Sequence, residues 1–267
     1  MRAVGGVILL IIVFSCNKVV QVTLPLYESE ITLEMYLEKG HQLKCLLSES
    51  LAYTDSSINK PLDSALVIFS DGTNSYTLQN KVLQDWETGR VYNYFNPRIL
   101  TPDMTKTYSI TITDKHNRKV TATTHFLSAI TAIDNVVAKQ SVNNPDSFSL
   151  GIIFNDPSKI DNYYRLLVAK KLTDFNAGQT DLLLNDIGFN GQSYSFFSEP
   201  EYARGDSVTI RLYSLQKEYY DYIKSAEDAR SSNFSPFVQP AWIKSNVTGG
   251  LGIFTAITFD QREIVVR

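Results

Sequence analysis

Residues 31–38, ITLEMYLE, decide the fold class of this chain. Apolar residues occupy every second position and alternate with Thr, Glu and Tyr, a period of two that is typical of a half-buried β-strand. Lys39-Gly40 supplies a turn, after which residues 41–47 are predicted to return as the neighbouring strand. The folded body is therefore predicted to begin with an antiparallel pair of strands.

The same alternation continues through the first half of the chain. Residues 65–69 form an apolar run that ends at the turn pair Asp71-Gly72, and residues 76–78 are expected as a short partner strand. Residues 108–113 alternate cleanly and are rich in β-branched side chains. Short strands at this spacing, separated by polar turns, predict an immunoglobulin-like β-sandwich over residues 25–127.

The second half, residues 128–267, restarts the pattern. We expect a second antiparallel β domain there, sandwich-like or barrel-like, so that the whole protein is all-β. One amphipathic helix is predicted over residues 215–230, where Leu215, Tyr219 and Ile223 share a face. The candidate strands cover residues 130–137, 147–154, 163–170, 193–197, 207–214 and 253–259.

Composition excludes several classes of protein. A chain of 267 residues has room for one or two domains. Its net charge of −3 offers no basic face, so we expect no nucleic-acid partner. Two cysteines cannot form a disulfide-dense framework, and Cys45, within an alternating segment, is expected to be a buried and unreactive thiol.

The N-terminus has the features of a bacterial lipoprotein signal peptide over residues 1–15. Arg2 is followed by an uncharged apolar run over residues 4–14, which is too short to span a bilayer as a helix. Val13-Phe14-Ser15-Cys16 resembles a lipobox, which predicts cleavage between Ser15 and Cys16 and attachment of acyl chains such as palmitate to Cys16. Residues 16–24 would then be a tether to outer-membrane lipid. The alternative is an ordinary cleaved signal peptide with an incidental cysteine.

The motifs of catalysis and metal binding are missing or incomplete. His41, His116 and His125 have no zinc-site spacing, and Ser195 stands where a nucleophile elbow over residues 191–195 needs glycine. The glycine run over residues 249–252 lacks the lysine of a phosphate-binding loop and is expected to permit close backbone packing or a turn with positive φ. We therefore expect no enzyme, no cofactor and no catalytic residue.

One metal-binding alternative stays open. Asp156, Asp161 and Asn162 carry oxygens that suit Ca²⁺, but their spacing matches no calcium-loop motif. Asp156-Pro157 is equally typical of an ordinary turn.

Clusters of aromatic residues suggest a binding face. The chain contains 15 Tyr and 14 Phe, and tyrosine suits recognition surfaces as well as sheet surfaces. If such a face exists, we expect it on two loops, whose candidate residues are Tyr92, Tyr94, Phe95, Phe234, Phe237 and Trp242. Cross-strand packing is the alternative explanation for these aromatic residues.

The second half also resembles a known family. Five segments carry the resemblance: Asp156-Pro157, NYYR at residues 162–165, YYDY at residues 219–222, Pro236-Phe237 with Pro240, and SNVTGGLGIF at residues 245–254. The last of these is the most distinctive. These segments resemble the domain-of-unknown-function 4249 (DUF4249) family of outer-membrane lipoproteins from Bacteroidota. The resemblance implies an all-β lipoprotein, commonly encoded beside TonB-dependent outer-membrane transporters, and it supplies no catalytic residue.

Together these features predict a non-enzymatic lipoprotein of the outer membrane that is accessory to a TonB-dependent transporter in ligand or nutrient capture. We expect it on the cell surface in preference to the periplasmic face. The alternative is a structural or adhesive surface lipoprotein with no transporter partner.

Overall fold

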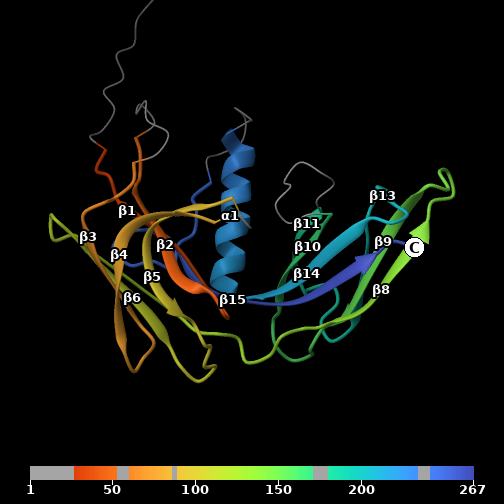
Figure 1. The fold of residues 1–267 in the computed structure, drawn as a ribbon, viewed down its shortest axis with the longest axis horizontal. Helices are drawn as coiled ribbons and strands as arrows, with labels where there is room; N and C mark the ends of the chain where they lie inside the picture. The colour runs from red at the N-terminus through yellow and green to blue at the C-terminus, as the bar shows by residue number, and fades with distance from the viewer. Residues whose placement is uncertain (1–26, 53–59, 86–88, 171–179, 234–240) are drawn as a thin grey trace, which may run out of the picture.

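The protein was analysed as a computed structural model, which describes residues 27–52, 60–85, 89–170, 180–233 and 241–267. Across these ranges the chain forms fifteen β-strands and one α-helix (Figure 1), which confirms the all-β prediction. No helix in the described ranges has the length and apolar character needed to cross a membrane.

The first half contributes seven strands, and their burial follows the alternation of the sequence. In β1 the side chains of Ile31, Leu33, Met35 and Leu37 are buried, while the residues between them are half-buried. Gly40, which has a φ of +79°, makes the turn to β2. The seven strands are β1 (Ile31–Glu38), β2 (Gln42–Glu49), β3 (Ala65–Ser70), β4 (Ser75–Gln84), β5 (Val91–Ile99), β6 (Tyr108–Asp114) and β7 (Lys119–Thr124).

The second half contains the remaining strands and the helix. The predicted helix over residues 215–230 is present as α1 (Lys217–Asn233), and the predicted last strand extends well beyond residue 259. The strands are β8 (Ile133–Gln140), β9 (Ser147–Asn155), β10 (Tyr163–Ala169), β11 (Thr180–Asn185), β12 (Ser193–Phe197), β13 (Tyr202–Ala203), β14 (Ser207–Leu215) and β15 (Leu251–Val265).

The main sheet has eleven strands and runs through both halves, in the order β11-β10-β14-β15-β1-β2-β5-β4-β3-β6-β7. Strand β15 joins the halves, because its first part pairs in parallel with β1 and its second part pairs antiparallel with β14. The second sheet consists of β8, β9, β12 and β13. Neither sheet closes on itself, so the barrel-like alternative for the second half is wrong and the architecture is an open sandwich.

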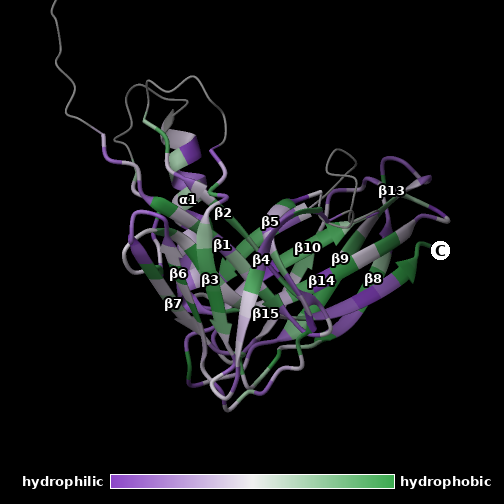
Figure 2. Ribbon diagram, turned by 60° about the vertical axis from the view of Figure 1, so that its left-hand side comes forward, coloured by the Kyte–Doolittle hydropathy of each residue, from purple (hydrophilic) through white to green (hydrophobic). Residues whose placement is uncertain are grey.

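The sheet of the first half curls until its last strand comes back near β15. A single isolated bridge joins Thr121 of β7 to Thr248, just before β15 begins. This curl encloses a hydrophobic core that contains residues of β1 to β7 together with Val247, Phe254 and Ala256. Figure 2 shows hydrophobic stretches in the strands of both halves and hydrophilic residues in many of the connecting loops. A second core lies between β9, β10 and β14 in the other half.

Helix α1 lies where the two halves meet. Its Tyr219 ring packs against Tyr36 of β1, with 5.7 Å between ring centroids, and its Tyr220 ring packs against Tyr163 of β10 at 4.8 Å. The helix starts beside the end of β1, because Glu38 pairs with Ile257 and the neighbouring Thr258 pairs with Ser214. From there α1 runs toward the end of the molecule at which β1 begins (Figure 1).

The glycine run before and within β15 permits the closest backbone contacts in this region. A Cβ atom on Gly250 would lie 2.4 Å from the Ile31 carbonyl oxygen, and one on Gly252 would lie 1.9 Å from that of Leu33. Gly252 also has a φ of +113°. The prediction that these glycines permit close packing and positive φ is therefore confirmed.

Candidate functional site

The structure corrects the first part of the predicted binding face. Tyr92, Tyr94 and Phe95 do not lie on a loop but in strand β5, between β2 and β4. Tyr92 and Tyr94 are buried, and the Tyr94 hydroxyl accepts a hydrogen bond from the Ala65 amide at 2.9 Å. Phe95 is half-buried. These three aromatic residues therefore pack within the sheet, in agreement with the alternative of cross-strand packing.

The second part of the predicted face, on the loop with Phe234, Phe237 and Trp242, is described only in part. Phe234 and Phe237 lie outside the described residues, as do Ser15 and Cys16. Trp242 is described and is 93% exposed. It lies beside α1, because the amide of Lys244 donates a hydrogen bond to Ser225 Oγ of the helix at 2.8 Å. Of the three candidates in this loop the structure describes Trp242 alone, so a binding face there stays a prediction.

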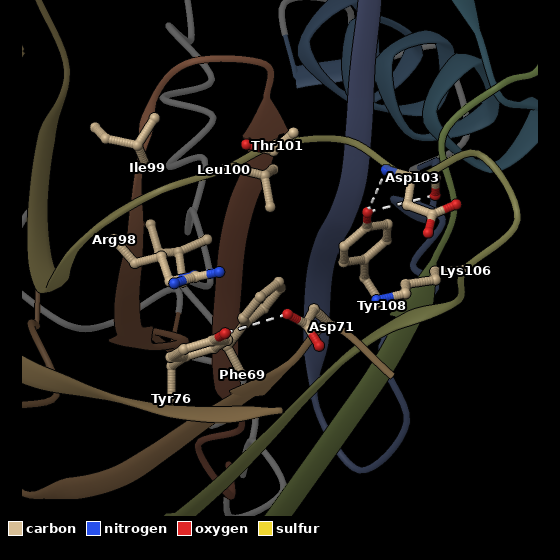
Figure 3. A pocket seen from close by; sticks show the side chains of 11 residues that line it. Phe69, Asp71, Tyr76, Arg98, Ile99, Leu100, Thr101, Asp103, Lys106 and Tyr108 are labelled. Atoms are coloured by element: carbon tan, nitrogen blue, oxygen red, sulfur yellow. Dashed lines mark hydrogen bonds between the residues drawn. The ribbon is translucent and has the colours of Figure 1, made fainter. Parts of the chain in front are cut away.

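A pocket that the sequence did not predict lies at the end of the first half that is remote from Ile31 (Figure 3). The turn after β3, the start of β4, the end of β5 and the loop before β6 meet there. Its volume is about 50 Å³, room for a few water molecules or one small ionised group. We call it the distal pocket; its lining includes Phe69, Asp71, Tyr76, Arg98, Ile99, Asp103, Lys106 and Tyr108.

Stacked aromatic rings form one wall of the distal pocket. Phe69 stacks on Tyr76 and on Tyr108, with centroid separations of 6.3 Å and 6.0 Å. The Arg98 guanidinium lies over the Tyr76 ring, 4.8 Å from its centroid. This cation–π contact orients the Arg98 side chain at the mouth of the pocket.

The two carboxylates of the distal pocket accept hydrogen bonds from residues of the loops in which they lie. Asp71 Oδ1 accepts hydrogen bonds from the amides of Asn74 at 2.7 Å and Thr73 at 2.9 Å, and these hold the pKa of Asp71 below its usual value. Asp103 Oδ1 accepts hydrogen bonds from the hydroxyl and the amide of Thr105, which lower the pKa of that carboxyl in the same way. Both groups are therefore ionised near neutral pH.

The two cations of the distal pocket, Arg98 and Lys106, have fewer close polar partners than its carboxylates. Neither Arg98 nor Lys106 forms an ion pair with any residue that the structure describes. Lys106 is nevertheless near enough to lower the pKa of both Asp71 and Asp103, whereas the Arg98 guanidinium has only the Tyr76 ring as its described side-chain contact. The N–H groups of Arg98 suit a ligand group that accepts hydrogen bonds, such as a carboxylate.

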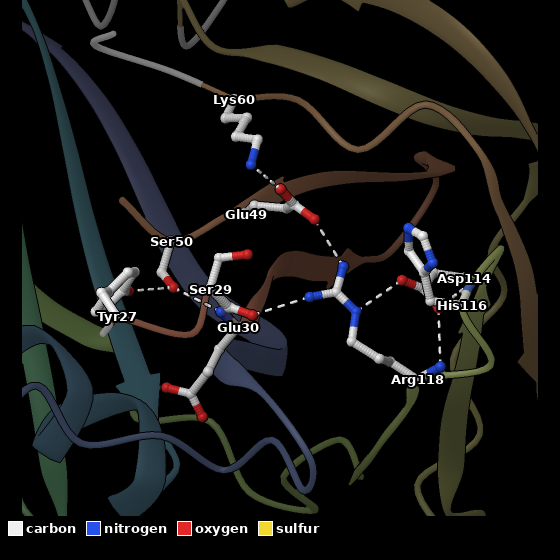
Figure 4. Close-up of polar contacts among 9 residues, drawn as sticks. All are labelled: Tyr27, Ser29, Glu30, Glu49, Ser50, Lys60, Asp114, His116 and Arg118. Atoms are coloured by element: carbon white, nitrogen blue, oxygen red, sulfur yellow. Dashed lines mark hydrogen bonds and ion pairs between the residues drawn. The ribbon is translucent and has the colours of Figure 1, made fainter. Parts of the chain in front are cut away.

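The opposite end of the first half carries a polar cluster built around Arg118 (Figure 4). Its guanidinium donates to Asp114 Oδ2 at 2.7 Å, to Glu49 Oε1 at 2.7 Å and to the Ser29 carbonyl oxygen at 2.9 Å. Glu49 also pairs with Lys60. These contacts line a wide hollow of about 660 Å³ and fix the segment that leads into β1.

Two of the three candidate calcium ligands, Asp156 and Asn162, have protein partners, while Asp161 is exposed. Asp156 accepts hydrogen bonds from the Tyr164 hydroxyl at 2.5 Å and from the Gly191 amide at 2.8 Å. The side-chain amide of Asn162 donates to the carbonyl oxygens of Pro157 and Ile160, each at 3.0 Å. The Asn162 contacts are local to a turn, whereas those of Asp156 join the turn to β10 and to the segment before β12.

A comparison with known families gives one match, a family described as "Domain of unknown function (DUF4249)", over residues 18–263. No curated protein matches the chain. The matched range contains the distal pocket, the Arg118 cluster and the glycine run, so all three belong to the part of the chain that defines the family.

Proposed function

The chain belongs to the DUF4249 family, and from this premise we propose that it is a non-enzymatic outer-membrane lipoprotein that captures a ligand for a TonB-dependent transporter. The proposed anchor is Cys16, behind the tetrad Val13-Phe14-Ser15-Cys16. Two acyl chains, at about 0.8 kcal/mol per buried CH₂ group, hold a protein on a bilayer without a spanning segment.

The observation that carries the proposal is that the two cations of the distal pocket form no close ion pair with any described residue. Arg98 and Lys106 lie at the end of the first half that is farthest from the start of β1, where the tether enters. A ligand site remote from the anchor faces away from the bilayer and is accessible to solutes. The chemistry of the pocket favours a nutrient that presents a carboxylate.

A binding screen tests the ligand part of the proposal. Short peptides and oligosaccharides are arrayed in pairs that differ only in a free or an amidated carboxyl group. We expect the protein to retain members with a free carboxylate and the variant Arg98→Gln to bind them about tenfold more weakly, a loss of about 1.4 kcal/mol. Arg262→Gln, an exposed arginine of the second half, is the matched control. Equal retention of both members of every pair would contradict a carboxylate site.

Co-purification tests the partner. After extraction in mild detergent, we expect the protein to be recovered with an outer-membrane transporter. An abundant protein that is recovered without one, in a strain where deletion alters attachment but leaves nutrient uptake intact, would favour the structural or adhesive alternative.

Fatty-acid labelling combined with protease treatment of intact cells tests the anchor and the face of the membrane. We expect a labelled protein that the protease removes from the cell surface. A labelled protein that resists the protease would indicate the periplasmic face.

A further inference from the structure

We propose that Trp242 and Ile243 insert into the interfacial region of the bilayer to which the protein is anchored, so that the body is held against the membrane and not merely tethered to it. This inference rests on the proposed lipid anchor at Cys16. We call the two residues the interfacial patch.

The exposure of the interfacial patch is the first observation. Trp242 is 93% exposed and Ile243 is 52% exposed, and the two are adjacent in the chain. A large aromatic residue so fully exposed beside a second exposed apolar residue is uncommon on a protein surface and indicates a contact site.

The backbone beside the interfacial patch is fixed. The Lys244 amide donates to Ser225 Oγ at 2.8 Å, and Lys244 Nζ pairs with Asp221 Oδ2 at 3.2 Å. Two anchoring contacts to α1 thus lie one and two residues from the exposed side chains. The patch is therefore presented on a fixed segment, which lowers the entropy lost on binding.

The position of the interfacial patch relative to the tether is the second observation. Helix α1 points toward the end of the molecule where β1 begins, and the segment before β15 runs beside it from that end (Figure 1). Ten residues lie between Cys16 and Tyr27, the first described residue, so the two are at most about 40 Å apart when the chain is fully extended. This end of the body therefore stays close to the bilayer at all times, which gives the patch a high effective concentration of lipid.

The chemistry of the interfacial patch identifies lipid as its occupant. Tryptophan has an apolar ring with one polar N–H and is enriched at membrane–water interfaces. The charges near the patch balance one another: Lys244 pairs with Asp221 and Lys224 with Asp228, and the exposed Glu227 and Arg230 of α1 carry opposite charges. With these charges balanced, insertion depends on the apolar side chains, and we expect it to be insensitive to the content of anionic lipid.

Quenching by brominated lipid tests the inference on the full mature protein. The chain has two tryptophans, so Trp86→Phe leaves Trp242 as the sole fluorophore. The lipidated variant is reconstituted on vesicles of phosphatidylcholine with brominated acyl chains, with and without phosphatidylglycerol. We expect the emission of Trp242 to shift to shorter wavelength and to lose about half of its intensity in both kinds of vesicle. If Trp86→Phe fails to fold, the same loss is measured as the difference between the wild type and Trp242→Phe.

An exposed tryptophan at the other end of the molecule is the matched control. Ile187 is 85% exposed and lies just after β11, whose last residue pairs with Tyr163 near the start of α1. Ile187→Trp in a Trp86→Phe, Trp242→Phe background is expected to remain unquenched. Quenching of Trp242 no greater than in this control, in protein that floats with the vesicles, would overturn the interfacial patch alone. Protein that does not float would overturn the anchor and the patch together.

Discussion

Arg118 joins three segments that are far apart in the sequence. Its guanidinium contacts Asp114, Glu49 and the carbonyl oxygen of Ser29, and the Asp114 side chain is fully buried. Removing one partner of a buried pair leaves the other charge without compensation. This residue therefore matters more for stability than an ordinary surface arginine.

We predict that Arg118→Met lowers the free energy of unfolding by about 2–4 kcal/mol, because Asp114 loses its cation. Lys224→Met is the control, since Lys224 and Asp228 are both more than half exposed and such pairs contribute at most about 0.5 kcal/mol. Urea denaturation at pH 7 measures both variants. Equal stability of the two would show that the Arg118 contacts contribute little.

The same cluster predicts an acid-sensitive stability. Hydrogen bonds from Lys60 and Arg118 lower the pKa of Glu49, and those from Arg118 lower the pKa of Asp114 although its burial acts in the opposite direction. A carboxyl with a lowered folded-state pKa stabilises the fold above its unfolded pKa of about 4, and this stabilisation is lost as the pH falls through the folded value.

We therefore expect the wild-type free energy of unfolding to fall steeply below about pH 4. The free energy of unfolding of Arg118→Met should fall less over the same range, so that the two values converge at low pH. Denaturation at a series of pH values measures both curves, with Lys224→Met expected to keep the wild-type slope. Parallel curves for wild type and Arg118→Met would contradict the assignment of this pH dependence to the cluster.

For individual residues, the sequence predicted which side chains are buried better than it predicted which side chains meet in a pocket. The period of two located Ile31, Leu33 and Met35 in the core, because alternation is a local property of a strand. Nothing local marks Arg98 or Lys106 as neighbours of Asp71, since their proximity depends on how β3, β4, β5 and β6 are ordered in the sheet.

Among the elements, strand β15 depends on a glycine for its close pairing with β1. Gly252 combines a φ of +113° with a Cβ position 1.9 Å from the Leu33 carbonyl oxygen, so any side chain there would force β1 and β15 apart.

We predict that Gly252→Ala lowers the free energy of unfolding by about 3 kcal/mol or more, through backbone strain and the lost pairing. Gly205→Ala, with a φ of +92° but no atom within 4 Å, is expected to cost about 1 kcal/mol. Gly188→Ala, also without a neighbour within 4 Å, is expected to change stability by less than about 0.5 kcal/mol. Thermal and urea denaturation measure the series, and a different order would contradict the steric explanation.

Strand β5 shows why one element escaped prediction. Asn93 is buried although both of its neighbours, Tyr92 and Tyr94, are also buried, so the strand does not follow the alternation of buried and exposed residues. Its side chain accepts a hydrogen bond from the Leu47 amide at 2.8 Å and donates one to the Leu47 carbonyl oxygen at 2.9 Å, as a backbone partner would. The Asn93 side chain thus makes hydrogen bonds that a backbone group of a strand would make. Since a polar residue stands in the middle of β5, the sequence pattern of this strand resembles that of a loop.

For the whole molecule, the main consequence of the topology is that the two halves share β15. Phe254 and Ala256 of this strand belong to the core of the first half, while Val208, Ile210 and Leu212 of the adjacent β14 belong to the second core. The sequence predicted the all-β class and most strands, but it carried no local signal that the first and last strands pair. The division of the sequence into two domains near residue 128 stays a prediction.

We expect the body to unfold in one transition and a fragment of residues 27–127 to be unstable on its own. The fragment lacks the partner of β1 and the Phe254 side chain, whose removal alone costs about 3–5 kcal/mol in a packed core. Circular dichroism and hydrogen exchange resolved to peptides of β3 and β9 measure this, with residues 27–267 as the control. A stable fragment, or exchange at clearly different free energies in the two halves, would contradict the expectation.

The parallel pairing of β1 with β15 also determines when the protein can fold. Strand β1 has one neighbour, β2, that follows it directly, but its other partner lies more than two hundred residues later in the chain. Sheets that depend on such distant contacts form slowly, since a long loop must close before any pairing compensates for the lost chain entropy. A chain crossing a membrane from its N-terminus would thus emerge with its central sheet incomplete until the last segment arrived.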